Sequence, residues 1–82
     1  MKEVLSELTS KQLQFIEDEF GISKEALDKL SEDELYEQVY DPCCIIEEIE
    51  TVNAIDNDVD MSERGAIAVE LVTMFGETIE DD

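Results

Sequence analysis

The chain has 82 residues, 24 acidic against five basic side chains and no histidine, so its formal net charge at pH 7 is −19. This length makes one small domain whose core leaves little room for a catalytic cleft. The absence of histidine excludes Ser-His and Cys-His nucleophile pairs, and the three isolated glycines do not form a phosphate-binding loop. We therefore expect a single acidic domain over residues 1–82, with 1–8 and 77–82 as candidate frayed ends, and no enzymatic activity.

The charge is unevenly distributed along the chain. From Leu30 to Asp82 there are 17 acidic residues and one base, Arg64, whereas residues 1–29 hold seven acids and four lysines. The hydrophobic content of 43% is ordinary for a globular domain, so the acids indicate a charged coat on a folded chain. Such a coat repels polyanions and anionic membranes and attracts basic proteins.

Two features indicate the compartment. The sequence has no run of about 18 apolar residues, and its start, Met1-Lys2-Glu3-Val4, lacks the apolar region of a signal peptide. The only cysteines, Cys43 and Cys44, are adjacent, whereas small secreted domains spread several cysteines along the chain. We expect a cytoplasmic protein.

Helix capping signals mark the N-terminal half of the chain. Thr9 followed by Gln12 has the form of a capping box, which predicts a helix from about Ser10, and Gly21 can adopt the left-handed backbone that ends it. The apolar positions of this helix are Leu13, Ile16 and Phe20. Ser23 predicts the start of a short second helix. The apolar positions of the second helix are Ala26, Leu27 and Leu30.

A third and a fourth helix are predicted around Asp41-Pro42. Ser31 with Glu34 is another capping box and opens a helix through about Tyr40. The apolar stripe of this helix is Leu35 and Val39, with Tyr36 as a further candidate. Asp41-Pro42 suits the start of a new helix, although a kink in the third is the alternative. We favour a break and a fourth helix to about Ala54. Its predicted apolar stripe is Ile45, Ile49 and Val52, with Glu47 and Glu50 pointing elsewhere.

The last predicted helix is the most apolar. A polar loop over residues 56–60 precedes it, and Ser62 and Glu63 can start a helix that continues to Phe75 or beyond. Its apolar side chains cover nearly the whole circumference: Ala66, Ile67, Ala68, Val69, Leu71, Val72, Met74 and Phe75. We predict an all-α fold, a single small domain of four to five short helices packed around this C-terminal helix, with no strands. One face of it is a candidate homodimer contact.

Two local motifs have alternative interpretations. Cys43 and Cys44 are either small core residues or, in the first turn of a new helix, thiols activated by the helix dipole. Asp56, Asp58 and Asp60 match the first ligand positions of a calcium loop, but Met61 and Ile67 occupy the glycine and bidentate glutamate positions. We predict a solvated loop, no metal site and no cofactor.

The segment from Ser62-Glu63-Arg64-Gly65 to Leu71-Val72-Thr73 resembles small acidic uncharacterised proteins of Firmicutes phages and mobile elements. In size, charge and helix content the chain is also similar to nuclease-immunity proteins and, as a class, to nucleic-acid-mimic inhibitors. The first resemblance covers about a quarter of the chain and implies no activity, and the second is a likeness of class without a shared motif.

Mimicry of nucleic acid agrees with the charge density. Duplex DNA carries one charge per about 1.7 Å, so a net charge of −16 after Lys29 corresponds to roughly 27 Å of duplex. The predicted partner-binding acids are Glu32, Asp33, Glu37, Asp41, Glu47, Glu48, Glu50, Asp56, Asp58, Asp60, Glu77, Glu80, Asp81 and Asp82.

The sequence thus predicts an inhibitor that binds a basic nucleic-acid-binding protein. Targets of this kind are a CRISPR or restriction effector, in the manner of a phage anti-CRISPR or anti-restriction factor, or a nuclease held by an immunity protein or antitoxin. We expect no direct binding to nucleic acid or membrane. The alternative is a helical interaction or homo-oligomeric assembly module whose acids only keep it soluble.

Overall fold

Helices account for all the regular structure in the described part of the chain. The structure is a computed structural model that describes the backbone of residues 2–80 and the side chains of residues 2–78. The elements are η1 (Lys2–Glu7), α1 (Ser10–Phe20), α2 (Lys24–Lys29), α3 (Glu32–Leu35), η2 (Tyr36–Tyr40), α4 (Asp41–Asp56) and α5 (Glu63–Glu80). No strand occurs among these residues, which confirms the predicted all-α class.

The capping box predicted for α1 is present. The Gln12 backbone N–H donates to Thr9 Oγ1 at 3.1 Å, and the Thr9 N–H donates to Gln12 Oε1 at 2.9 Å. At the other end Gly21 has φ +69°, where a side chain would be strained, and its N–H donates to the Glu17 carbonyl oxygen. Both ends of α1 are therefore specified by local sequence.

The next two helices also begin where the sequence predicts. Ser23 Oγ accepts the backbone N–H of Ala26 at 3.2 Å and caps α2. Ser31 Oγ accepts the N–H of Glu34 at 3.2 Å, and Glu34 Oε1 accepts the N–H of Ser31 at 3.0 Å. This second complete capping box starts α3.

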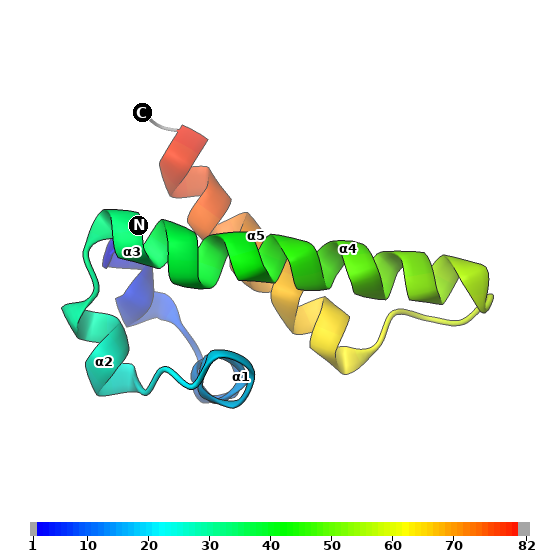
Figure 1. The fold of residues 1–82 in the computed structure, drawn as a ribbon, viewed down its shortest axis with the longest axis horizontal. Coiled ribbons are helices and arrows are strands. Elements are labelled where there is room, and N and C mark those ends of the chain that lie inside the picture. Colours follow the sequence, from blue (N-terminus) through cyan, green and yellow to red (C-terminus); the bar gives the residue numbers. More distant parts are fainter. Residues whose placement is uncertain (1, 81–82) are drawn as a thin grey trace.

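The break predicted at Asp41-Pro42 is wrong, because the backbone remains helical from Glu32 to Asp56. A π-helical turn, η2, lies just before the proline, and the Asp41 N–H donates to the Tyr36 carbonyl oxygen five residues earlier. Pro42 has no N–H, and in an α-helix its ring would press on the carbonyl four residues before it. The wider turn absorbs this misfit, so α3, η2 and α4 form one rod over residues 32–56 (Figure 1).

Both ends of the described part of the chain are helical. Residues 2–7, within the candidate frayed segment 1–8, form the 3₁₀ helix η1, whose Val4 and Leu5 belong to the core. Helix α5 extends to Glu80, beyond the predicted frayed boundary at residue 77. Asp81 and Asp82 lie outside the described residues.

Helix α5 lies against several other elements, as its apolar circumference predicts. It packs along α4 and also contacts α1 and η2. Ala68, Leu71 and Phe75 have no exposed surface, and Ile67 is also buried. Ala66 is exposed, so the apolar circumference is not completely covered. The homodimer contact on α5 stays a prediction.

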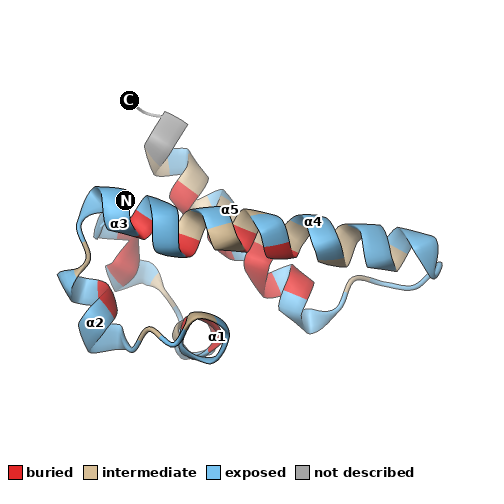
Figure 2. Cartoon of the chain, in the orientation of Figure 1, coloured by how far each residue is buried: buried red, intermediate tan, exposed pale blue. Residues whose placement is uncertain are grey.

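The predicted apolar stripe of α4 is wrong. Ile45, Ile49 and Val52 are 58, 49 and 49% exposed, and the C-terminal half of α4 is mostly exposed (Figure 2). The buried side of α4 instead carries Cys43 and Ile46. Tyr36, a candidate for the stripe of the third helix, is 41% exposed.

Helix α5 approaches α4 closely at Gly65, on the side of α4 that carries Glu50. A Cβ added at Gly65, in the first turn of α5, would lie 2.7 Å from Glu50 Cβ and 2.7 Å from Met61 Cγ. Only glycine allows this spacing. A Cβ added at Gly76, later in α5, would have Tyr40 Oη as its nearest neighbour, at an ordinary contact distance of 3.6 Å.

The two glycines therefore predict opposite effects of alanine. We expect Gly65→Ala to destabilise the domain by about 2 kcal/mol, because α4 and α5 must separate to admit the methyl group. Gly76→Ala should stabilise it by up to about 1 kcal/mol through helix propensity. Urea unfolding followed by circular dichroism measures both values, and equal effects at the two positions would contradict the close packing at Gly65.

Candidate partner-binding surface

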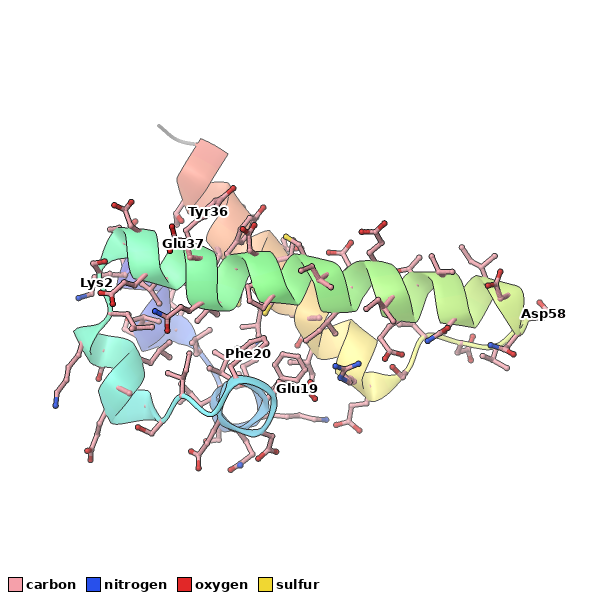
Figure 3. The ribbon with its side chains drawn as sticks, viewed as in Figure 1. Lys2, Glu19, Phe20, Tyr36, Glu37 and Asp58 are labelled. Carbon is pink, nitrogen blue, oxygen red and sulfur yellow. The ribbon has the colours of Figure 1, made fainter. Side chains whose placement is uncertain are left out.

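Exposed carboxylates run along the 32–56 rod. Asp33 and Glu37 are four residues apart near its start and are both exposed. Asp41, Glu48 and Asp56 are exposed in α4, with spacings of seven and eight residues that place them on one face. Figure 3 shows Glu37 near the α3 end and Asp58 at the far tip of α4. The rod therefore carries predicted site acids over most of its length.

The remaining predicted acids are distributed differently. Asp58 and Asp60 are exposed in the loop after α4, where Asp58 has φ +52°. Glu77 is exposed on α5, which contacts η2. Glu47 is only half-exposed. The side chain of Glu80 and the whole of Asp81 and Asp82 lie outside the described residues.

Two predicted site acids make specific contacts inside the domain. Glu32 Oε1 accepts the backbone N–H of Lys2 at 2.9 Å, which ties η1 to α3. The Glu50 side chain is only 16% exposed and bonds to Arg64 and Ser62. Glu50 is therefore a structural residue and contributes little to an outward acidic face.

Arg64, in the first turn of α5, bonds to acidic residues of α1 and α4 and so joins three helices. Its Nε and Nη2 donate to the two carboxylate oxygens of Glu19 in α1 at 2.9 and 2.8 Å. Its Nη1 donates to Glu50 in α4 at 2.8 Å. Bidentate pairing to Glu19 fixes the guanidinium more firmly than a single contact does. Figure 3 shows Glu19 at the end of α1, on the side facing α5.

Ser62 completes the cluster at the start of α5. Its hydroxyl donates to Glu50 Oε2 at 2.9 Å and accepts the backbone N–H of Gly65 at 3.2 Å. The Ser62 hydrogen bond, followed by that of Arg64, lowers the pKa of the Glu50 carboxyl below its ordinary value. The ionised Glu50 carboxylate therefore stabilises the fold fully at a pH above the ordinary pKa of a glutamate. This stabilisation is lost as the pH falls through the lowered pKa of Glu50 in the folded protein.

The basic residues gather away from the tip of α4. Lys2 and Lys24 flank a shallow cavity of about 480 Å³ between the N-terminal elements, with Leu5, Leu8 and Leu13 also lining it. Lys11 pairs with Glu63. In Figure 3 Lys2 and Asp58 lie at opposite ends of the molecule. Lys2 and Lys24 therefore lie far from Asp58, whereas the acidic start of the rod, at Glu32, adjoins Lys2.

An exposed apolar strip, defined as Ile45, Ile49, Val52 and Ile55, lies on the outer side of α4. Ile55 is 72% exposed, and Val59, just beyond the helix, is 61% exposed. The helical spacing of Ile45, Ile49 and Val52 predicts a core stripe, which the structure contradicts. Helix α4 has two apolar rows with helical spacing, and the predicted row is the one that faces outward.

The two cysteines are not activated by a helix terminus. Because the backbone is helical on both sides of Pro42, Cys43 and Cys44 lie inside the rod. Cys43 is fully buried, and burial raises its pKa to about 12. Cys44 is half-buried, and its pKa is also raised by burial, partly offset by a hydrogen bond with Tyr40. The interpretation as core thiols is the one that the structure supports.

Comparison of the chain with protein-family models, with curated proteins and with solved structures finds no match. Within residues 2–80, no group of three or more potential ligand side chains is arranged to hold a metal ion. None of the helices in that range combines the length and apolar character that a membrane span requires. The functional proposal therefore depends on the surface alone.

The three-helix contact of Arg64 predicts a specific loss of stability. Arg64→Gln should lower Tm by about 4–8 °C, because both Glu19 and Glu50 lose their cationic partner. Lys24→Gln is the matched control, since it changes the net charge equally at a position outside this cluster. Thermal unfolding followed by circular dichroism measures both, and equal shifts would show that only net charge matters.

The cysteine environments predict unequal and slow alkylation. In the native protein at pH 7, iodoacetamide should modify Cys44 slowly and Cys43 only after denaturant exposes it. Mass spectrometry of peptides from native and urea-treated samples measures the difference. Fast modification of Cys43 in the native state would contradict its burial.

Proposed function

We propose that this protein is a non-enzymatic acidic inhibitor that binds a basic nucleic-acid-handling protein at its nucleic-acid site. The observation that carries the proposal is the series of exposed carboxylates along the 32–56 rod, a segment without a single basic residue. The chemistry fits a nuclease or a CRISPR or restriction effector, whose grooves present lysine and arginine to phosphates.

The charge density of the rod favours a groove that binds a single nucleic-acid strand over one that binds a duplex. The rod is about 36 Å long at 1.5 Å per residue, within a longest dimension of 39 Å. Seven exposed acids lie on it, five of them between Glu32 and Asp41, so the average is about one per 5 Å. A single nucleic-acid strand carries one phosphate per about 3.4 Å, and a duplex one charge per about 1.7 Å. The density is thus closer to that of one backbone strand.

The distribution of the basic residues also supports capture by charge. The lysines belong to residues 1–29, and the only later base, Arg64, bonds to two carboxylates of its own domain. A basic partner is therefore attracted most to the α4 part of the rod and its tip, because the start of the rod adjoins Lys2. Attraction of this kind speeds association and weakens with added salt.

Capture experiments with charge-matched variants test the proposal. Protein immobilised on resin should retain basic nucleic-acid-binding proteins from a bacterial lysate at low salt, and added single-stranded DNA or RNA should release them. The variant Glu37→Gln, Asp41→Asn, Glu48→Gln should lower the affinity of a retained protein about tenfold, since three exposed ion pairs are lost. Titration of the purified retained protein measures the change.

The control variant Glu17→Gln, Glu25→Gln, Asp28→Asn changes the net charge equally but outside the rod. It should bind nearly as well as the parent protein. Equal losses from both variants would mean that the rod is not the binding surface. Retention that resists both salt and nucleic acid would overturn mimicry and favour the alternative of an interaction module bound through apolar contacts.

A further inference from the structure

The strip of Ile45, Ile49, Val52 and Ile55 is an exposed apolar surface that the folded monomer does not use. Single exposed apolar residues are normal on protein surfaces, but neighbouring ones that form a continuous face mark interaction sites. Ile45, Ile49 and Val52 recur at four and three residues, so they lie in line on one side of α4. Between 49 and 72% of each residue in the strip is exposed.

Isoleucine and valine also have a local cost at these positions. Their branched side chains lose rotamer freedom in a helix and are poorer helix formers than the glutamates and lysines usual on an exposed face. Packing inside the domain does not offset this cost in helix propensity, because the buried side of α4 is the opposite one, at Cys43 and Ile46. The residue types are therefore better explained by a contact outside the monomer.

Carboxylates surround this strip. Asp41, Glu48 and Asp56 are exposed on the same outer face of α4, and Asp58 and Asp60 follow in the loop beyond Ile55. No basic residue occurs from Leu30 to Glu63. An apolar row with an acidic border is complementary to an apolar row bordered by lysine or arginine, which is the surface of a basic amphipathic helix.

A second copy of this chain fits the strip poorly. With two α4 helices antiparallel, Asp41 of one copy would lie near Asp56 and Asp58 of the other. In a parallel arrangement each acid would meet its own counterpart. Neither arrangement provides a base from this surface to pair with the carboxylates, and like charges placed opposite one another oppose association.

We propose that the apolar strip of α4 is a docking site for a basic amphipathic helix of the partner protein. This inference rests on the proposed function for the basic character of the partner, but it does not need the partner's nucleic-acid groove. The surrounding acids bring the helix to α4, and its apolar side chains cover the isoleucines. The contact follows the pattern of helix-on-helix packing, with anchors at three- and four-residue spacing.

Two synthetic peptides of identical leucine and lysine composition test the inference. One places its leucines along one helical face, and the other distributes them around the helix. The parent protein should bind the amphipathic peptide about 30-fold more tightly than the scrambled peptide. In the variant Ile45→Gln, Ile49→Gln, Val52→Gln this preference should disappear while helicity and Tm stay at the parent level or rise. Calorimetry or fluorescence anisotropy measures the affinities.

The variant Glu37→Gln, Asp41→Asn, Glu48→Gln is the matched control. It should weaken both peptides alike, because it removes attraction and leaves the isoleucines in place. Equal binding of the two peptides by the parent protein would overturn the docking site. The docking site would also be overturned if the parent protein sediments as a dimer and the variant Ile45→Gln, Ile49→Gln, Val52→Gln sediments as a monomer. A second copy of the chain would then cover the strip.

The peptide measurements and the release of captured protein by nucleic acid can fail independently. Loss of the peptide preference would leave mimicry by the acidic rod untouched. Failure of nucleic acid to release a captured protein would leave the docking site intact.

Discussion

The contact between Gly65 of α5 and Glu50 of α4 determines how the rest of the domain is arranged. Glycine allows the two helices to approach until a Cβ would lie 2.7 Å from its neighbour. Next to it, Arg64 holds Glu50 and Glu19, so α1 is joined to the same point. Because Glu50 must face α5, the opposite side of α4, with its isoleucines, must face solvent.

This arrangement depends on an unusual use of charge. In a chain with a net charge of −19, two carboxylates around one guanidinium are a local exception to general repulsion. The Ser62 hydroxyl supplies a further donor to Glu50. Partly buried carboxylates with several donors are stabilised in their ionised form, which the lowered pKa of Glu50 reflects. Most of the other acids in the described part of the chain are exposed on the surface.

Sequence analysis succeeded where the determinants were local. Thr9 with Gln12, Ser31 with Glu34, and Gly21 each specify a helix end through contacts within a few residues. It failed at α4, because that helix has two apolar rows with helical spacing, and periodicity cannot decide between them. The decision depends on Gly65, which is distant in sequence. The π-turn before Pro42 was missed for a related reason: a proline signals a misfit, and the tertiary structure determines whether the helix ends or widens.

The exposed carboxylates and the exposed isoleucines of α4 have different physical roles. Carboxylates along the rod, on average about one per 5 Å, create a field that acts at a distance and is screened by salt. Exposed isoleucines act only on contact and are insensitive to screening. Charge complementarity mainly sets association rates, whereas well-packed apolar anchors mainly slow dissociation. A surface made only to imitate phosphates would need no isoleucines between its acids. The presence of both on one face of α4 therefore favours a partner that is first attracted by charge and then held by apolar packing.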